Sequence, residues 1–336
     1  MISIRRSSKE DIPAVMDFIS THWRSEHVLA KNRSLMEWQH CSEDGCNYIL
    51  ASEEGILVGV LGYIPTRRYD DELSAKNNIV WLALWKVHDD YQSSMVGLKL
   101  LKTLESLEPN SVMAVNGINL NHPPMYKALG FQVYELGQYY LPNSDKPQNL
   151  IQKPENLSLA TAISGRAILE RIDNNQLENM RVSALKTSAF KTIEYLRKRF
   201  TLHPFYDYKL YWIFLDGSLH AAIASRIADH NSSRVLRIVD FIGDPNVLGH
   251  CGSAFQKLMA EQSIEYIDFW QYGILSSVLK RAGFHKVDPG GELICPNHFE
   301  PFVAKNMRIL CCIKGSLEKS FIVCRADGDQ DRPNRL

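Results

Sequence analysis

The sequence has no excess of either charge, with 38 Lys and Arg residues against 38 Asp and Glu residues. A neutral chain has no overall field that attracts nucleic acid or an anionic membrane, so an anionic ligand would need a local site. The sequence also lacks the run of about eighteen apolar residues that a membrane span requires, and no apolar stretch follows the basic residues at its start. We therefore expect a cytoplasmic protein with no nucleic-acid partner and no membrane span.

Cysteines are few and follow no repeated spacing. The seven are Cys41, Cys46, Cys251, Cys295, Cys311, Cys312 and Cys324. An odd number without regular spacing favours reduced thiols over a disulfide framework. Cys41 and Cys46 also have no matching His or Cys pair nearby, which disfavours a zinc site. We expect free thiols and no metal.

The length of the chain favours two domains. At 336 residues it exceeds one typical domain. Its hydrophobic content of 45% and charged content of 23% are ordinary for a globular protein.

The first half alternates between strand and helix patterns. Apolar spacing predicts a helix at 9–19 and then strands and helices in a fixed order. The expected strands are 48–52, 56–65, 78–87, 111–115 and 132–141, and the expected helices are 94–107 and 119–131. We expect the strand at 132–141 to close the sheet of this half.

The second half repeats this order after a stretch rich in Pro, Asn and charge, which reads as a linker at 143–158. A helical region is expected at 167–200, followed by a hairpin that turns at Asp216 and Gly217. Further expected elements are strands at 234–242 and 266–270 and helices at 253–262 and 274–284. The last helix ends in Gly-Phe, as the helix at 119–131 does. The chain therefore reads as two copies of one fold, with domains at 1–142 and 159–336.

Two motifs in the first half suggest a family. The stretch 119–131 contains Asn119, Tyr126 and a terminal Gly-Phe, and 87–101 combines a strand end, a Gln, serines and a glycine before an apolar helix. In this order and at this distance they resemble the GCN5-related N-acetyltransferase family. The resemblance implies an α+β fold: two domains of this type, each with a mostly antiparallel mixed sheet flanked by helices.

The family binds acyl-coenzyme A through backbone N–H groups at a loop that enters a helix, where such groups receive phosphate. The resemblance assigns acetyl-coenzyme A, or another acyl-coenzyme A, to a set of residues here. They are Val87, Gln92, Ser93, Ser94, Met95, Val96, Gly97 and Asn119. Met95 departs from the pattern because the family usually has glycine there, and a side chain alters close backbone approach.

The resemblance also suggests catalytic residues. Tyr126 stands where the family often has a tyrosine that protonates the departing thiolate. The acceptor amine must lose a proton, and His88 and Asp89 at the end of a strand are the leading bases, with Asp90, Glu26 and His27 as alternatives. No motif fixes this base.

The second copy departs further from the family. Leu279 and Tyr272 stand at the places of Tyr126 and Asn119, and the loop at 243–252 lacks the spacing for phosphate. We expect this copy to bind no coenzyme A and to shape the acceptor pocket or the surface of a homodimer.

The predicted function is transfer of an acetyl or other acyl group from coenzyme A to a small-molecule amine. The end of the chain, 321–334, resembles tandem acetyltransferase-like proteins encoded with bacterial surface-polysaccharide genes, which suggests an amino-sugar nucleotide as acceptor. Three aspartates around Gly328 do not complete a calcium loop. The alternatives are an aminoacyl transferase of the peptidoglycan-bridge type and a non-catalytic binding or scaffold protein.

Overall fold

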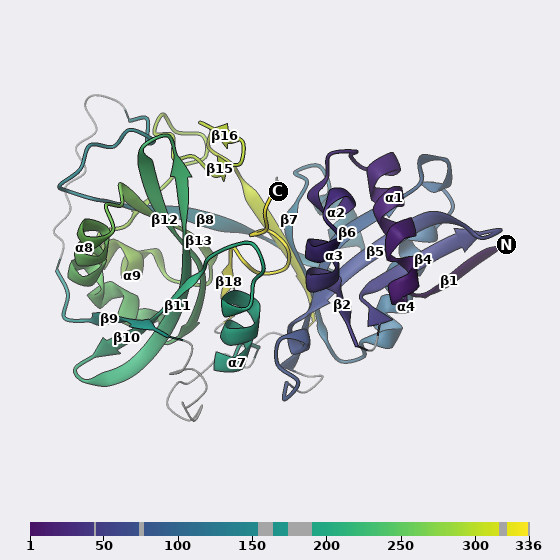
Figure 1. Cartoon of the computed structure of the whole chain (residues 1–336), viewed down its shortest axis with the longest axis horizontal. Coiled ribbons are helices and arrows are strands. Elements are labelled where there is room, and N and C mark those ends of the chain that lie inside the picture. Colours follow the sequence, from purple (N-terminus) through teal and green to yellow (C-terminus); the bar gives the residue numbers. More distant parts are fainter. Residues whose placement is uncertain (44, 74–76, 154–163, 174–189, 316–320, 335–336) are drawn as a thin grey trace. The chain divides into compact units, whose positions relative to one another are not determined.

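The computed structural model describes residues 1–43, 45–73, 77–153, 164–173, 190–315 and 321–334 (Figure 1). The chain forms two compact units, each assembled from separate segments. Unit 1 consists of Met1–Gln132, Cys312–Ser316 and Gly328–Leu336, and unit 2 consists of Val133–Cys311 and Leu317–Asp327. No helix in the described part of the chain is long and apolar enough to cross a membrane.

Unit 1 is built on one mixed sheet in the order β1-β4-β5-β6-β7. The strands are β1 (Ile2–Arg6), β4 (Tyr48–Glu53), β5 (Ile56–Pro65), β6 (Ile79–Val87) and β7 (Val112–Ile118). Neighbours are antiparallel except β6 and β7, which are parallel. Strand β17 (Ile309–Lys314) is the neighbour of β7, and its residues 312–314 belong to this unit.

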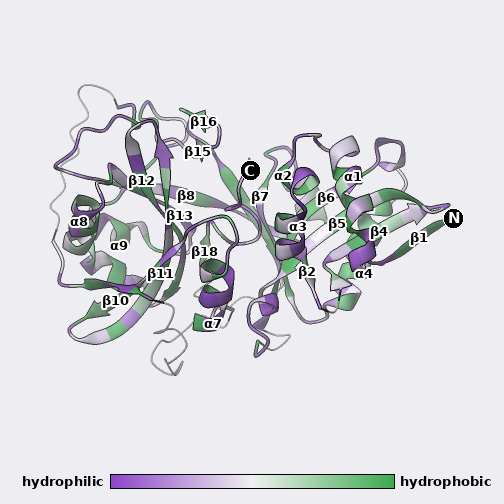
Figure 2. Cartoon of the chain, viewed as in Figure 1, coloured by the Kyte–Doolittle hydropathy of each residue, from purple (hydrophilic) through white to green (hydrophobic). Residues whose placement is uncertain are grey.

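Helices cover this sheet with their apolar sides. They are α1 (Ile12–His22), α2 (Val28–Lys31), α3 (Arg33–His40), α4 (Val96–Leu107) and α5 (Pro123–Ala128). The apolar positions of α1 recur at helical spacing and are buried. Helix α4 packs on β5 at Gly59, where an added Cβ would lie 3.2 Å from Val96. Figure 2 shows both hydrophobic and hydrophilic colour on the helices, as expected for elements with one buried side.

The strand expected to close the first sheet belongs to unit 2. Strand β8 (Gln132–Pro142) forms where the sequence predicts it, but it pairs antiparallel with β13 (Tyr266–Tyr272) of unit 2. The place beside β7 is taken by β17. The sequence did not predict this exchange of β8 for β17 beside β7, because local periodicity does not reveal which strand a given strand pairs with.

Unit 2 contains a second mixed sheet in the order β8-β13-β12-β11-β10-β9, with two short strands off this path. The strands not yet named are β9 (Ile168–Ile172), β10 (Lys209–Leu215), β11 (Ser218–His230), β12 (Ser233–Gly243), β14 (His285–Lys286) and β18 (Val323–Cys324). A separate hairpin joins β15 (His298–Phe299) to β16 (Phe302–Val303). Among the strand pairs described in this sheet, only β12 and β13 are parallel.

The helices of unit 2 complete the same sequence of elements as in unit 1. They are α7 (Ile193–Leu196), the π-helix η6 (Arg197–Thr201), the 3-10 helix η7 (Pro245–His250), α8 (Gly252–Glu261) and α9 (Ser276–Arg281). In each unit three antiparallel strands lead to a helix, a parallel strand and a short helix. The predicted fold class, mixed sheets flanked by helices, is confirmed.

Two local predictions in the second half need correction. The segment 167–200 was expected to be helical, but Ile168–Ile172 is an edge strand that pairs with β10; residues 174–189 lie outside the described part. The predicted linker at 143–158 is packed where it is described. The amide of Asn143 donates to the carbonyl of Glu265 at 2.9 Å, and Leu150 is buried in a hydrophobic cluster of unit 2. Residues 154–158 lie outside the described range.

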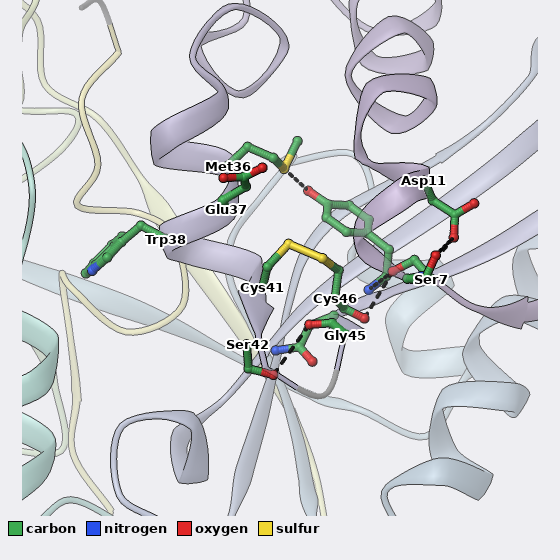
Figure 3. Close-up of a disulfide and its surroundings, with 12 residues drawn as sticks. Ser7, Asp11, Met36, Glu37, Trp38, Cys41, Ser42, Gly45 and Cys46 are labelled. Atoms are coloured by element: carbon green, nitrogen blue, oxygen red, sulfur yellow. Dashed lines mark hydrogen bonds between the residues drawn. A yellow bond between two sulfur atoms is a disulfide. The ribbon is translucent and has the colours of Figure 1, made fainter.

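The prediction that all cysteines are free was wrong for one pair. Cys41 and Cys46 form a disulfide (Figure 3). The short strands β2 (Cys41–Ser42) and β3 (Gly45–Cys46) place these residues opposite each other, with Cα atoms 4.1 Å apart. The sequence did not indicate this two-residue hairpin. The other five cysteines are buried and form no disulfide in the described part of the chain. Disulfides persist mainly in oxidising compartments, so a cytoplasmic location, which the sequence analysis expects, does not predict this bond.

Unit 2 contains a buried charge cluster. The ammonium of Lys191 lies 2.6 Å from Asp240 and 2.8 Å from Asp327, and all three side chains are almost fully buried. Asp240, Cys324 and Asp327 have ligand atoms within 4.8 Å of one another, and Lys191 supplies the cation between the carboxylates. Burial lowers the pKa of Lys191, but the two carboxylates outweigh it and raise the pKa. Burial raises the pKa of Asp327.

Replacing Lys191 by Met is expected to destabilise the protein in a pH-dependent way. Without the ammonium, two buried carboxylates face each other, which costs about 3–5 kcal/mol at pH 7. A carboxyl group whose folded pKa is raised destabilises the fold as pH rises through that pKa, so the cost should shrink toward pH 4. Urea unfolding at both pH values measures this. Lys257→Met, at an exposed lysine, is the control. An equal loss at both pH values would contradict the assignment.

Candidate functional site

The parallel strands β6 and β7 separate partway along their length. They pair from Ile79 with Val112 to Leu82 with Val115, and no further pair follows although both strands continue. Beside this point β6 contains one extra residue, because Leu61 of β5 pairs with Trp85 and Tyr63 pairs with Leu82. A bulge bends its strand away from regular pairing. The result is a gap in the sheet between two strand ends.

A cavity of about 470 Å³ lies at this gap. Its lining comes from the end of α1 and the start of α2, from β6 and β7, from α5 and from the C-terminal segment. The lining residues are Trp23, Arg24, His27, Val28, Leu82, Ala83, Trp85, Val115–Asn119, His122, Tyr126, Asp329, Gln330, Arg332 and Asn334. Cavities of this size accept small molecules or one arm of a larger ligand.

Tyr126 lines this cavity from α5. Its side chain is buried, and its ring meets Trp85 edge-on at 6.3 Å and Phe131 at 5.4 Å between centroids. Burial raises the pKa of Tyr126, and the nearby Cys312 adds to the shift. The phenol therefore keeps its proton at neutral pH. No hydrogen-bond partner for this hydroxyl is found among the described side chains and backbone, which leaves it able to bond to a ligand.

Asn119 also lines the cavity, at the end of β7. Its side-chain oxygen accepts a hydrogen bond from the amide of Asn121 at 2.9 Å. Its carboxamide N–H groups have no acceptor among the described residues, so it can donate into the cavity while it caps the turn before α5.

The predicted phosphate loop lies at the start of α4. Met95 precedes the helix in the left-handed conformation, with φ 62°, and its side chain is 60% exposed. The loop thus keeps the backbone shape that a glycine would give, and the Met side chain points to solvent. The amide of Ser94 donates to the carbonyl of Tyr91 at 3.0 Å. Within the described part of the chain, no acceptor is found for the amides of Met95, Val96 and Gly97.

The loop lies beside the cavity wall without lining the cavity. An added Cβ at Gly97 would be 3.5 Å from Nε1 of Trp85 and 3.6 Å from the side chain of Val87. Trp85 is itself a lining residue, so this ring connects the loop to the cavity. Gln92 donates to Asp89 at 2.8 Å, and Ser94 Oγ donates to the carbonyl of Tyr91 at 2.5 Å. Ser93 is exposed.

The predicted bases His88 and Asp89 do not line the cavity. His88 accepts from the amide of Asp90 at 3.2 Å, and its ring lies 4.5 Å from that of His22. Asp89 is exposed and pairs with Lys86 at 2.6 Å. This hydrogen bond lowers the pKa of Asp89, which makes it a weaker base. The role of either residue as a base stays a prediction.

The C-terminal segment forms a wall of the cavity that the sequence did not indicate. Gly117, with φ 80°, lies against Gln330, whose side-chain atoms would be 2.3 Å from an added Cβ. Arg332 donates from Nε to Asp329 at 3.3 Å, and both side chains are largely buried. The residues of this segment carry no periodicity that predicts burial, so only the tertiary contact reveals this wall.

His27 is the alternative base that does line the cavity, but it is held uncharged. Burial lowers its pKa to about 3, and the charges of Arg332 and Arg24 contribute. Its Nδ1 accepts from the amide of Leu29 at 3.2 Å, and its Nε2 lies 3.1 Å from Arg332. The imidazole therefore belongs to a polar wall beside two guanidinium groups.

In unit 2 two parallel strands also separate beside a bulge, but there another segment of the chain occupies the gap. Strands β12 and β13 pair only from Val235 with Tyr266 to Ile238 with Phe269, and β12 has one extra residue at Val239. Strand β18 pairs with the end of β13, and Ala326 donates to the carbonyl of Val239 at 2.9 Å. An added Cβ at Gly273 would lie 2.2 Å from the carbonyl oxygen of Phe321. The chain itself therefore occupies this gap.

Comparison with known proteins gives a fold. No protein-family model and no curated protein sequence matches the chain. Among solved structures, a GCN5-related N-acetyltransferase from Anabaena variabilis ATCC 29413 matches with a TM-score of 0.55 and 10% identity, over 93% of this chain and 72% of that one. A conserved protein of unknown function from Enterococcus faecalis V583, named a probable N-acyltransferase, matches with a TM-score of 0.55 and 8% identity, over the same shares. The chain shares the fold of these proteins.

Replacing Gly117 by Ala tests the packing of the C-terminal segment. The methyl group would clash with Gln330, and a left-handed conformation costs an L-residue about 1–2 kcal/mol. We expect lower stability and faster proteolysis of the C-terminal segment, with partial rescue in Gly117→Ala/Gln330→Ala because the clash is removed while the strain remains. Gly55→Ala, where φ is 83° with no neighbour within 4 Å, gives the strain alone. Equal losses in Gly117→Ala and Gly55→Ala would argue against the packing.

Proposed function

We propose that this chain is an N-acyltransferase that moves an acetyl or other acyl group from coenzyme A to a small-molecule amine. The observation that carries the proposal is the gap between β6 and β7, which opens a cavity next to the protonated phenol of Tyr126. The fold shared with solved acetyltransferase structures supports it.

The residues at the start of α4 fit the donor's diphosphate. Three consecutive amides, of Met95, Val96 and Gly97, precede or begin a helix of twelve residues. Helix N-terminal amides attract phosphate through their N–H groups and the helix dipole. The exposed Met95 side chain leaves the backbone reachable from solvent. We place the diphosphate here and the thioester in the cavity, with Trp85 between the two.

In the proposed reaction the acceptor nitrogen attacks the thioester carbonyl carbon. The new C–N bond forms, the C–S bond breaks, and its electron pair passes to sulfur. Tyr126 donates its hydroxyl proton to the sulfur, and the proton lost by the amine leaves through a base. Burial raises the pKa of Tyr126, so the phenol holds its proton at neutral pH and donates it only as negative charge develops on the sulfur. His88 and Asp89 remain the predicted bases.

The acceptor class rests on the cavity and on the sequence resemblance of the chain end. Amide side chains, charged groups and the indole rings of Trp23 and Trp85 line the cavity together. Polar groups beside aromatic faces suit a polyhydroxylated ring, which offers hydroxyls at its edge and C–H groups on its face. An amino sugar, such as an amino-sugar nucleotide of surface-glycan synthesis, is the acceptor that we propose.

Calorimetric titration with acetyl-coenzyme A tests the donor site. Met95→Gly should bind severalfold more tightly, because a residue without a side chain lets the diphosphate approach the amides more closely. Asn110→Gly is the matched control, since Asn110 also has positive φ, 65°, but follows α4 at its other end. Absence of heat with folded wild-type protein and folded Met95→Gly would end the proposal.

Tyr126→Phe tests the proton donor. We expect the rate of acetyl transfer to glucosamine to fall about 100-fold, with unchanged affinity for acetyl-coenzyme A. Stability should change by less than about 0.5 kcal/mol, because the hydroxyl has no described partner to lose. Release of free coenzyme A thiol measures the rate. Tyr140→Phe removes a buried hydroxyl in unit 2 as control. An unchanged rate would remove Tyr126 from the mechanism.

A further inference from the structure

The charges on the cavity wall specify the acceptor more narrowly. Two lining side chains carry a fixed positive charge, Arg24 and Arg332, and one described lining residue, Asp329, is a carboxylic acid. His27 adds no charge, because its pKa is lowered to about 3. The wall therefore has an excess of positive charge although the whole chain is neutral.

The two guanidinium groups differ in what they bind within the protein. Arg332 is 19% exposed and is held by neighbours: Nε donates to Asp329 at 3.3 Å, and Nη2 lies 3.1 Å from His27. Arg24 is exposed, follows α1 and forms no ion pair with any carboxylate in the described part of the chain. Both guanidinium groups contribute to the lowered pKa of His27, and both side chains line the same cavity. Arg24 is thus available to a ligand, and Arg332 reinforces its charge.

Asp329 supplies the opposite charge from the C-terminal segment. Its side chain is 6% exposed, and from the residues that the structure describes it receives only long hydrogen bonds, 3.3 Å from Arg332 and 3.5 Å from Gln330. A largely buried carboxylate with such long contacts keeps acceptor capacity for a stronger donor, and an ammonium group provides one.

A simple alkylammonium ion would be attracted by Asp329 and repelled by both guanidinium groups. An amine that also carries a phosphate or carboxylate group matches the charges of the cavity wall. Its ammonium group binds the carboxylate of Asp329, and its anionic group binds the guanidinium of Arg24. We propose that the acceptor is an amine that bears an anionic group, with Asp329 holding the ammonium and Arg24 holding the anion. This proposal rests on the proposed acyl transfer and names its substrate class.

The test compares two matched probes, glucosamine and glucosamine 6-phosphate. Binding is measured by calorimetry with and without saturating coenzyme A. The wild-type protein should bind the phosphorylated amine at least about tenfold more tightly, the usual effect of one charge-assisted contact pair. Arg24→Gln should abolish this preference. Asp329→Asn should lower the affinity for both probes by a similar factor. Circular dichroism of each variant confirms folding.

Arg33→Gln is the control, since Arg33 is an exposed arginine of unit 1 that pairs with Glu37 and lies outside the cavity lining. Equal affinity of the wild-type protein for both probes, binding of neither probe, or a preference that survives in Arg24→Gln would each overturn the proposal. If coenzyme A fails to bind while the preference and its loss are observed, acyl transfer is wrong and the site for an anion-bearing amine stands.

Discussion

The separation of β6 from β7 is the constraint on which the candidate site depends. Parallel strands normally keep their backbone groups paired along their full length, because a buried unpaired N–H or C=O group is costly. Here one extra residue in β6 ends the pairing after Leu82 and Val115. The strand ends beyond that point can bond to a ligand, and the short helix that follows β7 brings Tyr126 to the same place.

The separation of β12 from β13 in unit 2 shows that a segment of the same chain can occupy such a gap. Val323 and Cys324 pair with β13, and Ala326 bonds to the bulged residue of β12. The buried group of Lys191, Asp240 and Asp327 holds the end of this segment. The following residues, 328–334, belong to unit 1 and line its cavity. Residues 321–327 thus occupy the gap between β12 and β13, and residues 328–334 line the cavity at the gap between β6 and β7.

The sequence predicted those features that depend on local periodicity. The order of strands and helices in the first half follows from neighbours within a few residues, and the fold class follows from the family resemblance of the two motifs there. The exchange of β8, the Cys41–Cys46 disulfide and the cavity wall at Asp329 depend on contacts between distant segments or on a two-residue hairpin. Met95 shows what the sequence does not predict. A Met in place of Gly suggests that its side chain blocks the phosphate loop, whereas the backbone has the positive φ typical of glycine and the side chain is exposed.

A crystal structure of the protein with bound coenzyme A tests the central claim most directly. The account predicts that the diphosphate accepts hydrogen bonds from the amides of Met95, Val96 and Gly97, and that the thiol end of the pantetheine arm enters the gap between β6 and β7, near the hydroxyl of Tyr126. Coenzyme A bound elsewhere on the chain, or a gap that stays closed to the arm while the diphosphate binds, would contradict it.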